Sequence, residues 1–355
     1  MAVAWFFIMT LLGQAGGALA HPTATAVYAA RFVATKLLER EVPLIFVQIV
    51  VLVQLAGYIE EAGSPEFDFV EYFAGKLAIT QSMRGAGLRA FGYDLEYAVG
   101  DETNMLSVSG FIFAVMLACC GIARGAAWFA PVCSSWIWVC RSITGRWEGN
   151  AEGRRWIPSV MDGNIMCART VLLAYFFDAK GSMIGIEQPE GSVMEYSRRF
   201  QQLLTERSMF VSPEVALGLF GSASRKPIKV YSNVQSIGAI MQHRLHPSLP
   251  AGLATLCRVD TRADGSRACS GRRGILKESQ EYPRAFGEAV TRVFKDHIDG
   301  APASSWWDSM PADGLLEIEE VLGAVPEDVW EEANPGPVLL HLMSLVPDVP
   351  VWCRP

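Results

Sequence analysis

The sequence predicts an α/β protein with a doubly wound, mostly parallel sheet of the Rossmann-like methyltransferase type, preceded by an apolar N-terminal helical leader. Three observations lead to this prediction. Short apolar runs alternate with longer helical stretches between residues 67 and 233, as in a parallel sheet. Some runs are apolar at nearly every position, which is typical of strands buried on both faces. The chain has 355 residues, 51% of them hydrophobic, so it can bury a substantial core.

The first half of the pattern begins with an aromatic-rich run that ends at a glycine. Glycine also closes the first helix, as it commonly does at helix ends. The expected elements are a strand at 67–74 (FDFVEYFA), a helix at 78–87 (AITQSMRGAG), a strand at 89–96 (RAFGYDLE), a short third strand at 103–106 (TNML) and a buried helix at 107–123.

The second half continues the alternation with two further apolar strands. Each is long enough to cross a sheet, and the intervening stretches have helical length. The expected elements are a strand at 125–132 (GAAWFAPV), a helix containing residues 136–141, a helix at 164–181, a strand at 182–189 (SMIGIEQP), an amphipathic helix at 195–208 and a strand at 226–233 (KPIKVYSN).

Three regions follow from changes in composition: a leader at 1–64, a methyltransferase-like domain at 65–293 and an acidic segment at 294–355. The leader begins with an apolar stretch ending in Ala18-Leu19-Ala20, which fits a signal-peptide cleavage site but lacks basic residues before it. Residues 42–59 carry no charge and just reach the length of a bilayer span. A helix packed on the next domain explains this second stretch equally well. The protein is intracellular in that case, and secretory or membrane-associated if the leader is a signal or an anchor.

Charge is distributed unevenly around a net charge of −7. Residues 222–278 contain ten Lys and Arg against three Asp and Glu, a net charge of +7. Residues 296–355 contain one Arg against twelve acids, a net charge of −11. The basic segment fits a surface that binds nucleic acid, DNA more readily than RNA, although ordinary surface variation remains open. We expect a monomer.

Metal binding is not expected from the cysteines or histidines. The eight cysteines include no CxxC pair, and the five histidines show no ligand spacing. Free, mostly buried thiols are the default interpretation.

Polar residues follow four of the expected strands. Ala74-Gly75 follows the first, Asp94 the second, Pro131 to Cys133 the fourth and Glu187 the fifth. Ligands bind at the carboxyl ends of strands in such sheets, and an acid at the end of the second strand can accept both hydroxyls of a ribose. Asp94 as a helix or loop cap is the alternative.

Together, these strand ends resemble the S-adenosylmethionine-dependent DNA cytosine (carbon-5) methyltransferases over roughly residues 67–293. VEYFAG at 70–75 is similar to that family's D-x-F-x-G motif, APVCSSW at 130–136 to its G-P-P-C-Q-x-F loop and EQP at 187–189 to its E-N-V. YPRAF at 282–286 stands where a closing helix returns to the cofactor.

The resemblance implies a role for each matching residue. Cys133 would be the nucleophile and Glu187 the catalytic acid, and the cofactor-binding residues would be Phe73, Ala74, Gly75, Asp94 and Pro131.

In this chemistry a thiolate attacks carbon 6 of cytosine while a carboxylic acid holds a proton on the ring nitrogen. A helix beginning near Ser134 would lower the pKa of Cys133. Trp136 could form one wall of the pocket for a flipped base.

Two other hypotheses remain open. Val132 and Ser134 stand where the family has proline and glutamine, and Gln188-Pro189 stands where it has asparagine and valine. No Q-x-R-x-R segment is evident. These departures favour a non-catalytic relative with a binding role. A membrane-tethered interaction protein is the third hypothesis. Cys133 as a buried structural thiol, Glu187 as an ion-pair residue, and Trp136 and Trp138 as core residues are the simpler alternatives.

Overall fold

The computed structural model describes residues 24–55, 67–97, 100–207, 209–255, 257–261, 263, 267–271, 280–300 and 314–323. The Ala18-Leu19-Ala20 sequence, residues 272–278 of the basic segment and most of the acidic segment lie outside these ranges.

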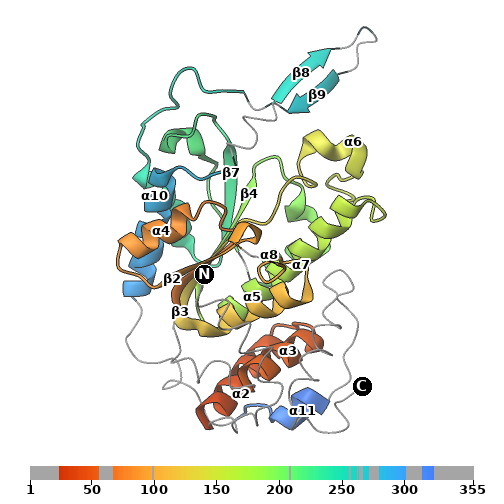
Figure 1. Cartoon of the computed structure of the whole chain (residues 1–355), viewed down its shortest axis with the longest axis vertical. Coiled ribbons are helices and arrows are strands. Elements are labelled where there is room, and N and C mark those ends of the chain that lie inside the picture. The colour runs from red at the N-terminus through yellow and green to blue at the C-terminus, as the bar shows by residue number, and fades with distance from the viewer. Residues whose placement is uncertain are drawn as a thin grey trace.

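A seven-stranded sheet forms the centre of the molecule (Figure 1). The strand order is β2-β1-β3-β4-β7-β5, and β6 also pairs with β7. The first four strands in this order are parallel, and β7 runs antiparallel to β4. The strands are β1 (Phe67–Tyr72), β2 (Ala90–Tyr93), β3 (Gly121–Phe129), β4 (Met183–Pro189), β5 (Phe210–Val211), β6 (Val215–Ala216) and β7 (Pro227–Ser232). The prediction of an α/β fold with a mostly parallel sheet is confirmed, whereas the antiparallel direction of β7 was not predicted.

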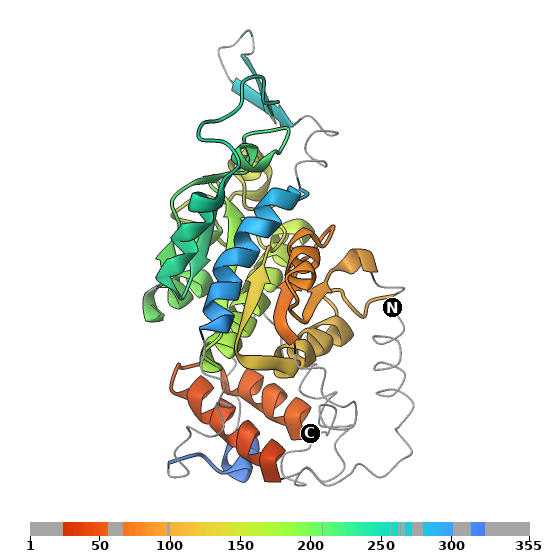
Figure 2. The ribbon, with the colours of Figure 1, turned by 90° about the vertical axis from the view of Figure 1, so that its left-hand side faces the viewer.

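Helices cover both faces of the sheet (Figures 1 and 2). One face carries α5 (Val108–Cys120) and α7 (Pro158–Ala179), with α8 (Arg198–Glu206) packed beside α7. The other carries α4 (Ala78–Gly85) and α10 (Arg284–Asp299), which pack tightly against each other. The short α6 (Arg141–Thr144) follows β3. The 3₁₀ helices are η1 (Leu95–Tyr97), η2 (Trp138–Cys140), η3 (Met194–Tyr196), η4 (Leu217–Phe220) and η5 (Gln235–His243).

Alternate residues of each strand enter two separate cores. Val70 and Tyr72 of β1 pack with α5 and α7, whereas Phe69 packs with α4 and α10. In β3, Phe129 faces the first core and Trp128 faces the second. This alternation follows from the two-residue repeat of a strand, and it decides which polar side chains share a face.

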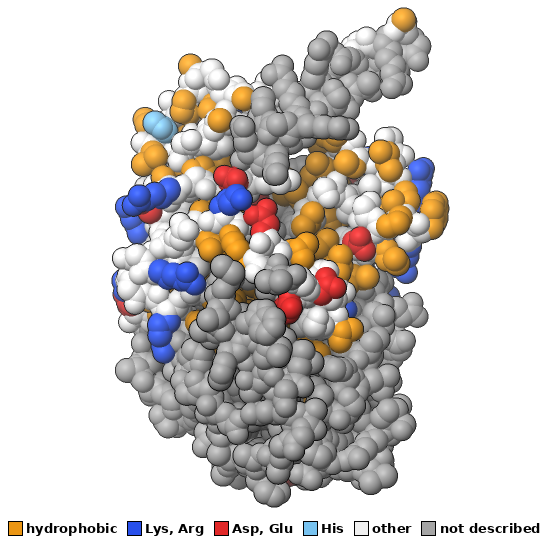
Figure 3. Space-filling view, in the orientation of Figure 1, with side chains coloured by type: hydrophobic (Ala, Val, Ile, Leu, Met, Phe, Trp, Pro, Cys, Tyr) orange, Lys and Arg blue, Asp and Glu red, His pale blue; other side chains and the backbone are white. Residues whose placement is uncertain are grey.

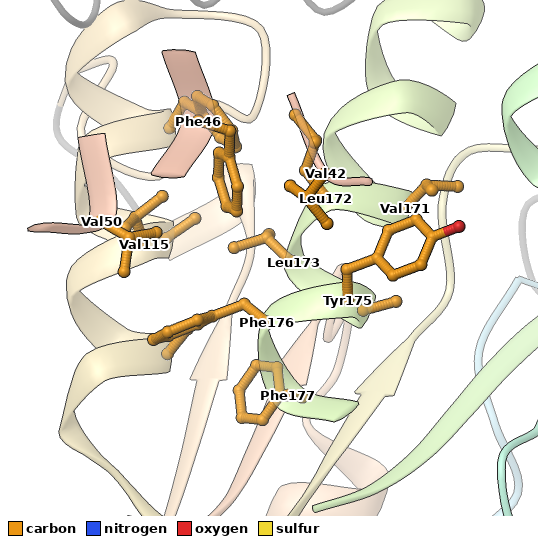
Figure 4. Packing of buried hydrophobic residues seen from close by; sticks show 14 of the residues in the cluster. Val42, Phe46, Val50, Val115, Val171, Leu172, Leu173, Tyr175, Phe176 and Phe177 are labelled. Carbon is orange, nitrogen blue, oxygen red and sulfur yellow. The ribbon is translucent and has the colours of Figure 1, made fainter. Parts of the chain in front are cut away.

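A third layer covers the outer side of α5 and α7 (Figure 1). It consists of α2 (Ala24–Leu38), α3 (Leu44–Leu55) and α11 (Ile318–Gly323). Phe46 and Val50 of α3 are fully buried and point toward Val115 of α5 and Leu173 of α7 (Figure 4). Arg31 of α2 donates hydrogen bonds to the carbonyl oxygens of residues 315 and 316, just before α11. Residues 44–55, within the apolar stretch at 42–59, therefore form a helix that packs on α5 and α7.

Among the described residues, one helix is long and apolar enough to cross a membrane. It is α7, and 72% of its most apolar window is buried inside the molecule. This helix packs between the sheet and the α2–α3 layer.

A two-stranded hairpin, β8 (Cys257–Thr261) and β9 (Arg267–Gly271), carries the middle of the basic segment. It projects from the end of the molecule opposite α2 and α3 (Figure 1), and β9 contacts η2. Helix α10 continues to Asp299, across the expected domain boundary at residue 293.

Two expected elements are wrong. Residues 103–106 form turns instead of a third strand, and Asn104 supplies backbone and side-chain acceptors for the start of α5. The expected helix over 136–141 is a turn, a single bridge and η2, and α6 begins only at Arg141. Consequently no α-helix begins near Ser134.

We expect Phe46→Ala to lower the free energy of unfolding by about 3–5 kcal/mol, because it leaves a cavity between α3 and α5. Denaturant unfolding in detergent-free buffer measures this effect. Glu39→Ala, at an exposed position of the turn after α2, is the control and should change stability by less than about 0.5 kcal/mol. Equal stability of Phe46→Ala and wild type would contradict the packing of α3.

Candidate functional site

The strand order reverses at β1, because β2 lies on one side of it and β3 on the other. The carboxyl ends of β1 and β3 thus form the topological switch point where open α/β sheets bind their ligands. The predicted site residues follow β1, β2 and β3 or, in the case of Glu187, lie near the carboxyl end of β4, and so lie along one edge of the sheet.

The turn after β1 has an unusual backbone. Phe73, Gly75 and Leu77 have positive φ angles of 60°, 50° and 61°, while Ala74 and Lys76 between them do not. Alternation of left-handed residues with ordinary ones turns successive N–H groups inward, the arrangement of an anion-binding nest. Positive φ at the two non-glycine residues costs roughly 1–3 kcal/mol each, and such strain concentrates at ligand sites.

Asp94 holds this turn in place. Its Oδ2 accepts a hydrogen bond from the Gly75 N–H at 2.8 Å, and its Oδ1 accepts one from the Glu96 N–H at 2.9 Å. The Tyr93 carbonyl also accepts from the Ala74 N–H at 3.1 Å. Gly75 and Asp94, two of the predicted cofactor residues, are therefore hydrogen-bonded to each other. Asp94 caps the turn, which is the alternative role that the sequence left open for it.

A buried glutamine joins the loop of Cys133 to the strand of Glu187. Gln188 Nε2 donates to the Pro131 carbonyl at 2.7 Å, and Gln188 Oε1 accepts from Ser192 at 2.8 Å. Gln188 is only 1% exposed, so both bonds are shielded from water. Gln188, one of the two residues that depart from the E-N-V motif, thus joins the loop of Cys133 to the strand of Glu187.

Glu187 lies in a nearly dry environment. Tyr282 donates a hydrogen bond to Glu187 Oε2 at 2.9 Å, while Oε1 is buried without a hydrogen-bond partner. Trp128 Nε1 in turn donates to the Tyr282 oxygen at 3.4 Å. Burial raises the pKa of Glu187, and the charge of Lys226 and the Tyr282 hydrogen bond partly oppose this rise.

Cys133 is close enough to Glu187 for their charges to interact. Burial and then the Glu187 charge raise the pKa of Cys133 to about 11, and the charge of Lys226 opposes this increase. The expected lowering of the pKa of Cys133 by a helix is absent, because no helix begins there. The half-buried Cys133 thiol and the buried Glu187 carboxyl both have raised pKa values, which favours states in which the pair retains a proton.

Sequence reasoning missed a second buried acid, Glu71, on the same face of the sheet. Glu71 Oε2 accepts from the N–H and hydroxyl of Thr80 at 2.8 and 2.6 Å, and Oε1 has no hydrogen-bond partner. Burial raises the pKa of Glu71 to about 7. Glu71 pairs in register with Trp128, whose indole contacts Tyr282. An acid within the apolar run FDFVEY was the available signal, because acids are almost never buried without a role or a partner.

Trp136 is not a wall of an open pocket. It is 1% exposed, and the Arg146 guanidinium stacks on its ring with 3.4 Å between the guanidinium carbon and the ring centroid. Trp138, in contrast, is 47% exposed. Trp136 is therefore a core residue, as the alternative interpretation of the sequence predicted, whereas Trp138 is not.

A surface groove of about 620 Å³ lies between α4 and α10, and Lys76 and Tyr282 contribute to its lining. Cys133 and Asp94 do not line it, so this groove is separate from the sheet edge. Within the described ranges, no group of three or more His, Cys, Asp or Glu side chains has the arrangement of a metal site.

No protein-family model matches the chain, and no curated protein or solved structure shows significant similarity to it. The function of the site is therefore inferred from the arrangement of its own residues.

We expect Glu187→Gln to lower the pKa of Cys133, because it removes the negative charge that raises this pKa. Lys226→Met should have the opposite effect. The rate of iodoacetamide alkylation as a function of pH, followed by peptide mass spectrometry, measures both changes. Cys140, half-buried in the same protein, is an internal control. Identical alkylation profiles for Cys133 in the variants and wild type would contradict the coupling.

The pKa of Glu71 predicts a pH dependence of stability. The unfolded state releases the Glu71 proton near pH 4.5 but the folded state releases it near pH 7, so stability falls as the pH rises through this window. Glu71→Gln lacks this loss and keeps an oxygen for Thr80. Between pH 4 and 8, its unfolding free energy should rise relative to wild type by about 3 kcal/mol, as measured by denaturant unfolding. Glu96→Gln, at an exposed position, is the control; an equally large change there would contradict this assignment.

Proposed function

We propose that the protein transfers a methyl group from S-adenosylmethionine to carbon 5 of cytosine in DNA, through a covalent adduct with Cys133. The observation that carries this proposal is the link between the Cys133 loop and the Glu187 strand. Support comes from the Gln188–Pro131 hydrogen bond, which links the loop that contains Cys133 to the strand that contains Glu187, and from the effect of the Glu187 charge on the Cys133 thiol. The glycine turn capped by Asp94 lies at the same edge of the sheet.

The residues after β1 and β2 fit the cofactor. A Cβ built on Gly75 would meet no atom within 4 Å, so a ligand can approach the backbone there. Asp94 uses one acceptor position on each oxygen, and each oxygen retains a second for a ribose hydroxyl. Phe73, Ala74, Gly75, Asp94 and Pro131 are the residues that would hold the cofactor. S-adenosylmethionine, when bound, supplies the methyl group that carbon 5 takes up.

The chain supplies the nucleophile and the proton. As the Cys133 sulfur bonds to carbon 6, the thiol proton passes to the Glu187 carboxylate, and the carboxylic acid holds it on the ring nitrogen of cytosine. Neutralising Glu187 also removes the charge that raises the pKa of Cys133. The thiol and the acid thus activate each other in one step. The thiolate leaves again when carbon 5 loses its proton to water.

A second candidate function is a non-catalytic methyltransferase-fold protein that binds its ligand without reacting. The pKa of Cys133, raised to about 11, favours this alternative, because a thiol in that state is a weak nucleophile at neutral pH.

Transfer of a labelled methyl group to DNA distinguishes the two functions. We expect wild-type protein to transfer label and Cys133→Ser to fall to the background rate, because serine is a poor nucleophile without a base. Cys140→Ser is the matched control and should retain activity. We expect Glu187→Gln to lower the rate by about 10²- to 10⁴-fold.

Calorimetric titration with S-adenosylmethionine completes the test. Cofactor binding without transfer by the wild type would support the non-catalytic alternative. Absence of cofactor binding would contradict both candidate functions. Transfer to RNA but not DNA would retain the chemistry and correct the substrate.

A further inference from the structure

Three tryptophans that contribute little to the core lie close in sequence after Cys133. Trp138, Trp147 and Trp156 are 47%, 58% and 80% exposed, respectively. Tryptophan is normally highly buried, and single-domain proteins rarely expose several large apolar side chains within one short segment. Hydrophobic side chains gather on the surface around α6 (Figure 3). We call these three residues together with Ile143, which is 64% exposed and lies in α6, the tryptophan platform.

A rigid base holds the platform. The buried Arg146 lies over Trp136 and donates to Asn164 Oδ1 and the Val160 carbonyl, both at 2.9 Å. It also donates to Ser135 at 3.3 Å. Every residue in this network is buried, so Arg146 holds Ser135 and Trp136 against the start of α7. The exposed tryptophans lie in the segments that begin and end at these anchored residues.

Cationic side chains lie among the exposed rings. Arg141 begins α6 and is exposed. Arg154 is exposed too, and it donates to the carbonyls of Ser142 and Ile143 at 3.2 Å, which fixes it beside α6. Strand β9 of the basic hairpin contacts η2, which contains Trp138. The exposed guanidinium groups of Arg141 and Arg154 therefore supply positive charge at α6.

This combination fits nucleic acid with unpaired bases better than a protein partner. Single-stranded nucleic acid is bound by aromatic rings that stack on bases and by cations that follow the phosphates. Trp138 also lies only five residues after Cys133. In the proposed reaction Cys133 reacts with a base that has left its duplex.

We propose that the tryptophan platform binds the unpaired strand that flanks the base at Cys133. The occupant is a single-stranded segment of nucleic acid, recognised through stacking on Trp138, Trp147 and Trp156 and not through its sequence. The part of the proposal that puts this strand beside the reacting base depends on the proposed function. The part that says the platform binds unpaired bases does not depend on it.

Fluorescence anisotropy with a labelled 20-nucleotide oligothymidylate tests the proposal on the full-length protein. Each change of one platform tryptophan to alanine should weaken binding by about 5- to 100-fold, which is the loss of one stacked base. Trp156→Phe should retain most of the affinity, because phenylalanine still stacks. Phe210→Ala and Val211→Ala, at positions 41% and 48% exposed in β5 and outside the platform, are matched controls and should bind as wild type does.

The outcomes separate this proposal from the proposed function. Oligonucleotide binding that depends on the tryptophans, without methyl transfer, would support the platform and contradict the enzyme. Methyl transfer with an unchanged KM for DNA in Trp156→Ala and Trp138→Ala would contradict the platform alone. Absence of oligonucleotide binding by the wild type, or equal losses in the control variants, would overturn the platform, and a protein partner would then be the better explanation of the exposed rings.

Discussion

Two helices that are buried over most of their circumference, α5 and α7, determine the arrangement of the molecule. Nearly every residue of α5, and most of α7, is buried, so each helix needs an apolar surface on both of its sides. The sheet provides one surface, and α2, α3 and α11 provide the other. The N-terminal apolar segment is thereby required as a cover for the core. With both faces of the sheet covered, the candidate site lies at the carboxyl edge of the strands, and Glu71 and Glu187 remain buried there.

The face of the sheet that packs against α4 and α10 carries a row of buried polar groups. This row connects the turn after β1 to Glu187. Glu71 lies beside Trp128, the Trp128 indole contacts Tyr282, and the Tyr282 hydroxyl donates to Glu187. Two carboxyls that each have an oxygen without a hydrogen-bond partner are costly in a dry environment, unless protonation or a ligand satisfies them. This row links the turn after β1 to the end of β4, and therefore the predicted cofactor site to the predicted catalytic site.

Local patterns in the sequence were sufficient for the strands and helices that bury continuous apolar runs. They failed where a long-range contact decides the structure. Residues 103–106 look like a strand in isolation, yet Asn104 and its neighbours form a turn that starts α5. Tyr282 is separated from Glu187 by 95 residues, and no periodicity predicts that contact. Gln188 looked like the loss of a motif residue, whereas its buried bond to Pro131 joins the two loops that the motif was expected to position. The sequence also could not distinguish Trp136 from Trp138, because the partner that buries Trp136 is Arg146, beyond the intervening α6.

The packing of α11 on α2 and α3 has a consequence for biosynthesis. Residues 24–55 are synthesised before their partners α5 and α7, and α11 is complete only at Gly323. At about 5–20 residues per second, the 268 residues that follow Leu55 up to Gly323 take roughly 15–50 s to synthesise. During that interval the apolar helix α3 lacks part of the surface that covers it in the folded protein. We therefore expect chaperones that recognise exposed apolar segments to bind the nascent chain.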